Sequence, residues 1–313
     1  MQRIKDVLVG LGPRNPIVRF ALKLHGRRHR FTIGFPGKLI AIRRGSREIL
    51  LAEKDFYLVP IMLECFDQTF EDIGAVRTEG LDVLNFSKPG SHTYKRHGIT
   101  LSFPGMPEDD SIAGYTHWYA PAAGDRVFDI GAHAGFTACM FARMVGPSGR
   151  VIAFEPDAGS LGYLEKNIAA LGVSNVTIVA KAVDAKSGTA VFNADGTMGA
   201  GLVEHSIYGK TGRHTAVETI SLEDACIQFG IPQFVKIDIE GAELAVIEAS
   251  AEFLKKTPVN LAFDSYHRMR DGRFTWMPLE PILRSMGYEV GSSEEFGQMF
   301  TWARVDPNKT VLE

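Results

Sequence analysis

The stretch VFDIGAHAGF, from Val127 to Phe136, decides the fold of this chain. It begins with a short apolar strand in which Asp129 is the only charged residue. Gly131 and Gly135 then remove side chains from a turn whose backbone a ligand can approach, and from Phe136 apolar residues recur at helical spacing. The stretch predicts a strand, a glycine turn and a helix, with free backbone N–H groups that can bind a small anionic ligand.

The spacing of the glycines limits what this turn can bind. A dinucleotide-binding turn has the pattern Gly-x-Gly-x-x-Gly, but here His133 stands two residues after Gly131, and the next glycine is Gly135. A bulky imidazole at that place argues against a pyrophosphate packed on the turn. An ordinary strand-to-helix connection remains the alternative interpretation of the turn alone.

A second apolar strand, residues 150–154, ends in Glu155, about 20 residues beyond the glycine turn. At this position of an α/β sheet an acidic side chain usually holds a ribose, because one carboxylate accepts hydrogen bonds from both hydroxyls. A helix over 157–171 and a third strand over 176–183 are predicted next. Asp184, at the end of that strand, is expected beside an adenine ring.

The segment KIDIEGAE, Lys236 to Glu243, places several charges near the end of an apolar strand. Its side chains are apolar on both faces, as in a buried parallel strand. Buried unpaired charges are costly, so Lys236, Asp238 and Glu240 are expected to line a cleft, pair with one another or bind a ligand. An ion pair between Lys236 and a carboxylate that only closes the sheet edge is the alternative.

The strand over 259–263 is followed by Asp264 and His267. Neighbouring strand ends are expected to gather these two residues with Asp238 and Glu240 around one cleft. A neutral histidine or a carboxylate there can take a proton from a hydroxyl. The same donors could hold a divalent cation, and the sequence does not separate the two roles. We expect no metal, because the spacing does not require one.

The order DIGAHAGF, AFEP, NVTIVAKAV and FVKIDIEGAELAVIEA resembles the FkbM family of S-adenosylmethionine-dependent methyltransferases over about residues 115–305. The resemblance implies an α/β, class I (Rossmann-like) fold with a seven-stranded, mostly parallel sheet. It also implies a terminal antiparallel hairpin, which 287–291 and 299–305 can form. His267 matches the family's pattern, whereas Asp264 stands where family members commonly have a glutamate.

The resemblance further implies the cofactor S-adenosyl-L-methionine and methyl transfer to a hydroxyl of a glycan, a glycolipid or a secondary metabolite. A nucleotide-linked oxidoreductase and a non-catalytic cofactor-binding module are the alternatives. His267, Asp238 and Glu240 are the expected catalytic residues. The expected cofactor residues are Asp129, Gly131, His133, Gly135, Phe136, Glu155, Pro156 and Asp184.

The N-terminal part differs in charge from the rest. Residues 1–50 carry twelve Lys or Arg and two Asp or Glu, a balance of +10 in a chain of net charge −3. We expect a basic, amphipathic helical segment over 1–30 that either contacts an anionic membrane surface or packs on the acidic remainder. An α+β cap region over 31–114, the methyltransferase domain over 115–305 and a tail over 306–313 complete the expected domains. No nucleic-acid partner is expected, since the basic segment lacks an aromatic stacking platform.

Composition predicts a cytoplasmic protein, at most peripheral at the inner face of the membrane. The chain has no run of about 18 apolar residues that could span a bilayer. Its first twenty residues lack the apolar core of a signal peptide. Its three cysteines, Cys65, Cys139 and Cys226, are widely spaced, as is typical of free thiols in a reducing compartment.

Overall fold

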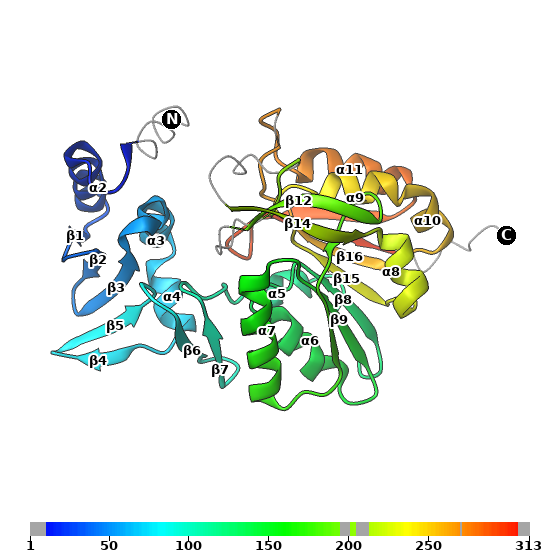
Figure 1. The fold of residues 1–313 in the computed structure, drawn as a ribbon, viewed down its shortest axis with the longest axis horizontal. Coiled ribbons are helices and arrows are strands. Elements are labelled where there is room, and N and C mark those ends of the chain that lie inside the picture. The colour runs from blue at the N-terminus through cyan, green and yellow to red at the C-terminus, as the bar shows by residue number, and fades with distance from the viewer. Residues whose placement is uncertain (1–10, 195–200, 205–212, 270, 306–313) are drawn as a thin grey trace. The chain divides into compact units, whose positions relative to one another are not determined.

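A computed structural model describes residues 11–194, 201–204, 213–269 and 271–305 (Figure 1). The chain divides into two compact units, 1–109 and 110–313. The basic segment therefore belongs to the same unit as the region that follows it, and the division lies five residues before the expected boundary at 115. The expected tail, 306–313, lies outside the described residues.

The N-terminal unit is an α+β structure that begins with helix α2 (Pro16–Arg28). Its main sheet has the order β1-β2-β3-β5-β4, in which only β3 and β5 pair in parallel. A separate hairpin is formed by β6 and β7. The elements are β1 (Thr32–Gly34), β2 (Leu39–Arg44), β3 (Arg47–Ala52), η1 (Glu53–Leu58), α3 (Val59–Glu64), α4 (Phe66–Asp72), β4 (Val76–Thr78), β5 (Leu81–Asn85), β6 (Gly90–Tyr94) and β7 (Ile99–Phe103).

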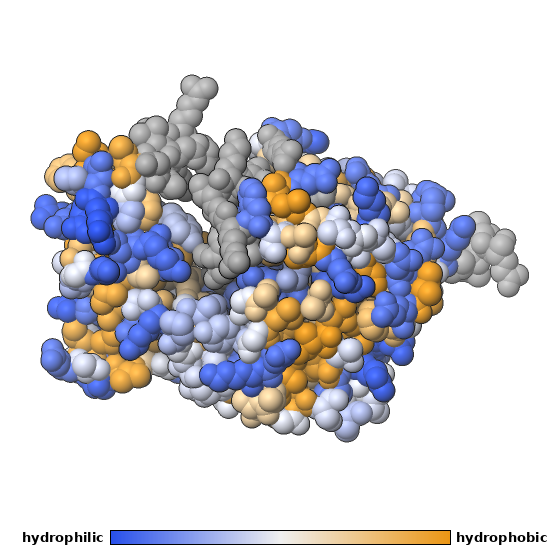
Figure 2. All heavy atoms as spheres, viewed as in Figure 1, coloured by the Kyte–Doolittle hydropathy of each residue, from blue (hydrophilic) through white to orange (hydrophobic). Residues whose placement is uncertain are grey.

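Helix α2 is amphipathic. It begins where the Asn15 side chain accepts a hydrogen bond from Ile17 N, and proline at its first position has no N–H to satisfy. Its buried residues, Val18, Leu22 and Gly26, face β1, whereas other apolar side chains remain exposed. Figure 2 shows hydrophobic residues beside hydrophilic ones on the surface of this unit.

The second unit contains a seven-stranded mixed sheet of order β10-β9-β8-β15-β16-β18-β17. The first five strands are parallel, and β18 and β17 form an antiparallel hairpin at the edge. The α/β class and the terminal hairpin agree with the expectation from sequence. The strands are β8 (Arg126–Ile130), β9 (Arg150–Phe154), β10 (Val176–Val179), β15 (Phe234–Ile237), β16 (Asn260–Asp264), β17 (Glu289–Ser293) and β18 (Phe300–Arg304).

The third predicted strand, 176–183, is in fact two. Its first half is β10, but the chain leaves the large sheet after Val179, and β11 (Ala182–Val183) pairs with another sheet. That sheet has the order β11-β14-β12-β13, with β12 (Gly188–Ala194), β13 (Gly201–Leu202) and β14 (Arg213–Ile220). Apolar residues continue through the break, so the change of sheet has no local signal in the sequence.

Helices cover both faces of the large sheet, because its central strands are apolar on both sides. On one face lie α6 (Phe136–Val145), which packs on β8 and β9, α7 (Ala158–Leu171), which packs beside α6, and α5 (Ile112–Tyr115), which contacts β16 and β18. On the other face lie α8 (Leu222–Phe229), α9 (Glu243–Ala249), α10 (Ala251–Lys256) and α11 (Trp276–Ser285). Within the described ranges, every helix is too short or too polar to cross a bilayer.

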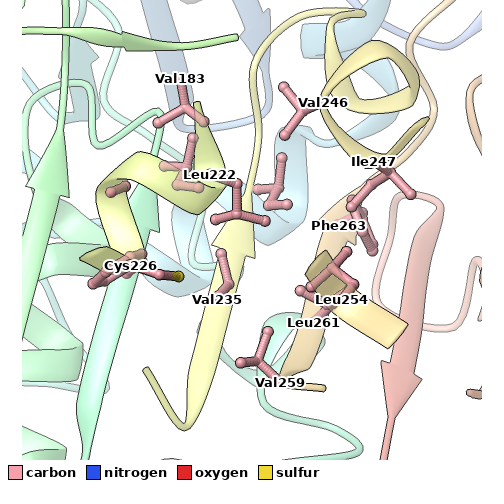
Figure 3. Close-up of a cluster of buried hydrophobic side chains, with 14 of the residues drawn as sticks. Val183, Leu222, Cys226, Val235, Val246, Ile247, Leu254, Val259, Leu261 and Phe263 are labelled. Atoms are coloured by element: carbon pink, nitrogen blue, oxygen red, sulfur yellow. The ribbon is translucent and has the colours of Figure 1, made fainter. Parts of the chain in front are cut away.

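The core of this second face fixes the ends of β15 and β16 (Figure 3). Val235 of β15 and Phe263 of β16 are fully buried, and Val246 and Ile247 of α9 pack on them. Burying each such side chain contributes about 1.5–3 kcal/mol. The polar residues that follow these strands are thus attached to a close-packed support.

Candidate active site

The candidate site lies where four neighbouring parallel strands, β9, β8, β15 and β16, end at one edge of the sheet. The register places Lys236 of β15 opposite Asp129 of β8 and Ala262 of β16. Since parallel strands end at the same edge, the segments that follow them meet there. These segments are the glycine turn, Glu155, residues 238–243 and residues 264–267.

The glycine turn is held by oxygens of the protein itself. The N–H groups of Gly131 and Ala132 both donate to Phe154 O at 3.0 Å, and the N–H of His133 donates to the Glu155 carboxylate at 2.8 Å. The sequence predicts free N–H groups at this turn, and for these three residues that expectation is wrong. Instead, the three amides fasten the turn to the end of β9.

The glycines are required by close contacts within the fold. Gly131 has φ +80°, and a Cβ there would lie 1.8 Å from Asp238 O, which no side chain can do. Gly135 has φ +92°, and its Cβ would lie 2.5 Å from Leu164 Cδ1. From sequence, both glycines are explained by the approach of a ligand. In the structure a backbone carbonyl already excludes a side chain at Gly131, and at Gly135 the positive φ favours glycine while the Leu164 side chain would have to move.

A buried ion pair supports the turn from below. Asp129 is 0% exposed and its Oδ2 accepts a hydrogen bond from Thr137 Oγ1 at 2.7 Å. Lys236 is 2% exposed, and its Nζ lies 3.2 Å from Asp129 Oδ1 and donates to Gly131 O at 2.6 Å. The Lys236 ion pair raised as an alternative from sequence is present, and it also holds the carbonyl of the glycine turn.

Glu155 is 6% exposed and accepts one hydrogen bond on each carboxylate oxygen. The donors are the N–H groups of His133, at 2.8 Å, and Asp157, at 2.7 Å. Burial raises the pKa of Glu155 to about 7, against the opposing effects of His133 and of these hydrogen bonds. A carboxylate offers about four acceptor positions, so two are left for further donors.

The other expected cofactor residues, Phe136, Pro156 and Asp184, differ in how they are placed relative to the glycine turn and Glu155. Phe136 is fully buried at the start of α6, and Pro156 follows Glu155 directly. Asp184 follows β11, on the smaller sheet, where its Oδ1 accepts a hydrogen bond from Ala185 N at 2.7 Å. The structure thus joins the glycine turn to Glu155 through the His133 N–H, whereas Asp184 follows a strand of the smaller sheet.

The three expected catalytic residues come together beyond β15 and β16. His267 Nε2 lies 3.5 Å from Glu240 Oε1 and 3.8 Å from Asp238 Oδ1. The His267 side chain is 4% exposed, that of Glu240 16% and that of Asp238 29%. The cluster therefore has a buried imidazole and one carboxylate open to solvent. We call these three residues the acid–imidazole cluster.

Two residues that fix the cluster were not assigned this role from sequence. Glu243, 0% exposed, lies with its Oε1 2.9 Å from His267 Nδ1 and accepts hydrogen bonds from the N–H groups of Ile239 and Gly241. Tyr115, also buried, donates from its hydroxyl to Asp238 Oδ2 at 3.0 Å. In the sequence, Glu243 indicates only a favourable charge in the first turn of a helix. Tyr115 lies 123 residues from Asp238, so no local pattern predicts their contact.

Charge in this region changes the pKa of several groups. Burial opposes a charge on His267, but Glu240 and Glu243 outweigh it and raise the pKa of the imidazole well above its ordinary value. Burial raises the pKa of Glu240, with His267 opposing. Burial and the charge of Asp238 raise the pKa of Asp264, whose Oδ2 accepts from Gln298 at 2.9 Å. Perturbed carboxyl and imidazole groups of this kind are typical of functional sites.

This arrangement can do two kinds of chemistry. Carboxylates beside a histidine at the open edge of an α/β sheet can bind a hydroxyl, and a carboxylate can accept its proton. The oxygen and nitrogen atoms of Asp238, Glu240 and His267 also lie within 4.8 Å of one another, a separation that a bound metal ion could bridge. On the other side of Gly131, Glu155 can accept hydrogen bonds from a diol.

Comparison with known proteins identifies the second unit. The family model described as a methyltransferase FkbM domain matches residues 129–290, more than half of the chain. The match includes the glycine turn, Glu155 and the whole acid–imidazole cluster.

Individual relatives match more distantly. A protein-L-isoaspartate O-methyltransferase of Aeropyrum pernix is 31% identical over 83 residues, which are 26% of this chain and 30% of that protein. An FkbM methyltransferase structure from Methylobacillus flagellatus KT is 16% identical with a TM-score of 0.46, over 62% of this chain and 47% of that one. A precorrin-6y C5,15-methyltransferase structure from Geobacter metallireducens GS-15 is 15% identical with a TM-score of 0.42, over 64% and 90%. The chain thus spans less than half of the first two relatives.

Proposed function

Because the chain belongs to the FkbM methyltransferase family, we propose that it transfers the methyl group of S-adenosylmethionine to a hydroxyl oxygen of a glycan, a glycolipid or a secondary metabolite. The acid–imidazole cluster beside the glycine turn is the observation that carries this proposal. It puts groups that can activate a hydroxyl next to the turn that typically seats the cofactor. The family match also argues against the nucleotide-linked oxidoreductase.

The residues around the glycine turn fit the cofactor. Glu155 keeps acceptor capacity on both carboxylate oxygens for a ribose diol, although it is otherwise buried. Asp129 is fully buried, so it acts on the cofactor turn through Lys236 and Thr137. Gly131, His133, Gly135, Phe136, Pro156 and Asp184 complete the proposed cofactor set.

When bound, S-adenosylmethionine would supply an electrophilic methyl group and leave as the neutral thioether, and the proton of the methylated hydroxyl would pass to a carboxylate of the acid–imidazole cluster. Asp238 and Glu240 then serve to bind and orient the acceptor hydroxyl, and the cluster with His267 serves to activate it. The exposure of Asp238 gives an acceptor access to the cluster from solvent. Such positioning accounts for a large part of the rate of methyl transfer in general.

Helix α2 supports a peripheral contact with an anionic membrane surface. Ile17, Phe20 and Leu24 are 63%, 68% and 42% exposed, and their spacing places them on one face of the helix. Arg27 and Arg28 lie in its last turn. Exposed apolar residues with flanking basic ones are typical of helices that lie in a membrane interface. Such a location favours a lipid-linked acceptor.

The function is tested by transfer of a labelled methyl group from S-adenosylmethionine to glycan, lipid and metabolite extracts. We expect label in an alkali-stable ether product, and loss of at least about a hundredfold in rate for His267→Ala. An exposed histidine in the N-terminal unit, His29, provides the matched control variant His29→Ala, which should retain the rate. Full turnover by His267→Ala, or binding of S-adenosylhomocysteine without any transfer, contradicts the proposal.

A further inference from the structure

Beyond the proposed methyl transfer, we propose that Asp238, Glu240 and His267 form a binding site for a divalent cation of the Mn²⁺ or Mg²⁺ type. Binding of the ion does not depend on the proposed function, but its role in activating the acceptor hydroxyl rests on that function. The ligand atoms of Asp238, Glu240 and His267 lie within 4.8 Å of one another at the open edge of the sheet.

The orientation of His267 is the first argument. Its Nδ1 lies 2.9 Å from Glu243 Oε1, and Glu243 is itself fixed by the N–H groups of Ile239 and Gly241. Metal-binding histidines commonly donate their second N–H to a carboxylate in this way, which fixes the ring and its tautomer. The arrangement leaves Nε2 as the atom that points at Asp238 and Glu240.

Nε2 itself is the second argument. It is buried, and among the described residues it has no hydrogen-bond partner, although two carboxylate oxygens lie 3.5 and 3.8 Å away. Two ligands about 2.1 Å from one ion lie between about 3 and about 4.2 Å apart. Both carboxylate oxygens lie within this range of Nε2, so a cation between them and the imidazole satisfies that nitrogen.

The position of Asp238 is the third argument. Tyr115 donates to its Oδ2, and Lys236 Nζ lies 3.8 Å from the same oxygen. This leaves Oδ1 directed toward His267. His267 and Asp238 thus each have one atom directed at a common point while neighbouring groups hold the ring or the other oxygen, and Glu240 directs its Oε1 to the same imidazole nitrogen.

Charge is the fourth argument. Lys236 lies closer to Asp129, at 3.2 Å, than to Asp238, at 3.8 Å. Among the described residues, Glu240 and Glu243 pair with His267, and Asp238 lies 3.8 Å from both His267 and Lys236, so these three carboxylates share one imidazole and a lysine that is closer to Asp129. Glu240 and Glu243 are 16% and 0% exposed, and buried carboxylates need compensation, which a divalent cation supplies. Its remaining coordination positions can take water or the oxygen of the acceptor hydroxyl, whose proton then passes to solvent more readily.

Binding of MnCl₂ to the full chain, followed by electron paramagnetic resonance, tests the site. We expect the signal of free Mn²⁺ to decrease until one ion is bound per chain. Glu240→Gln and Asp238→Asn, which keep the side-chain shapes, should each weaken binding by about tenfold or more. Glu289→Gln, at a carboxylate that is 47% exposed and paired with Arg304, is the control and should bind as the unmodified chain does.

Melting temperature provides a second measurement, because an ion that binds only the folded state raises it. MnCl₂ should raise the melting temperature of the unmodified chain and of Glu289→Gln, but not that of Glu240→Gln. An unchanged Mn²⁺ signal with the unmodified chain, or equal binding by all variants, overturns the site.

The experiments distinguish failure of the ion site from failure of the proposed methyl transfer. Methyl transfer that continues in EDTA, together with no Mn²⁺ binding, overturns the ion site and leaves the proposed function in place. Mn²⁺ binding that depends on Glu240, in a chain that methylates no hydroxyl, supports the ion site and overturns the proposed function.

Discussion

Gly131 and Asp238 approach each other so closely that the position of a Cβ on Gly131 lies 1.8 Å from Asp238 O. This contact joins the glycine turn, which faces the proposed cofactor, to the segment that carries the acid–imidazole cluster. The two halves of the candidate site are therefore held in register by backbone, and a methyl group is enough to disturb both.

Gly131→Ala should lower the free energy of unfolding by about 2–5 kcal/mol. The left-handed φ costs about 1–2 kcal/mol for a residue with a Cβ, and overpacking adds about 1–3 kcal/mol. Gly162→Ala is the matched control, because Gly162 lies in α7 with open space around it. This substitution should make the protein slightly more stable. Urea unfolding measures both, and equal effects of the two substitutions would argue against the contact.

Lys236→Met should lower the free energy of unfolding by about 3–5 kcal/mol, because it leaves the fully buried Asp129 without its cation. Lys255→Met is the control, since Lys255 and Glu252 are 45% and 78% exposed and their pair contributes less than about 0.5 kcal/mol. Asp129→Asn combined with Lys236→Met should recover part of the loss. A double variant that is no more stable than Lys236→Met shows that the ion pair is not the cause.

The pKa of Glu155 predicts a pH dependence of cofactor binding. Burial raises this pKa to about 7, so the carboxyl is mostly protonated at pH 6 and mostly ionised at pH 8. Hydroxyl groups donate more strongly to the ionised form. Calorimetry should therefore show that affinity for S-adenosylhomocysteine increases by about tenfold over this range. NAD, used as the control ligand, should give no binding heat.

The raised pKa of Glu155 has the opposite effect on stability: cofactor affinity should increase with pH, whereas the stability of the folded protein should decrease. The folded protein holds the Glu155 proton more tightly than the unfolded chain, whose pKa lies near 4.5. Stability from this group is complete below the unfolded pKa and is lost as pH rises through about 7. Glu155→Gln should remove the pH dependence of both cofactor affinity and stability. If the variant keeps the pH profile of the unmodified chain, another group is responsible.

Phe20→Ser should weaken co-sedimentation with anionic vesicles by about tenfold, because burial of a phenylalanine contributes about 1.5–3 kcal/mol. Phe20 is 68% exposed on α2, and Ile227, 74% exposed on α8, provides the control Ile227→Ser. Binding should also decrease with salt, as expected for the basic flank of α2. If deletion of residues 1–30 leaves sedimentation unchanged, the membrane contact is wrong.

The sequence by itself determined the order of strands and helices around the site. Local periodicity, capping residues and glycines predicted the elements now called β8, α6, β9 and α7 within a residue or two, and the terminal hairpin as well. These features could be predicted because each depends on residues close together in the chain. The gathering of Asp238, Glu240 and His267 also followed from sequence, since parallel strands end at one edge.

Only the tertiary structure decided how those residues are held. Apolar periodicity ran past Val179, yet competition between two sheets moved β11 out of the large one. Likewise, the pairing of Glu243 with His267, and the contact that requires glycine at position 131, join segments that are 24 and 107 residues apart. Such contacts depend on the packing of whole elements, and a linear pattern of residues carries no record of them.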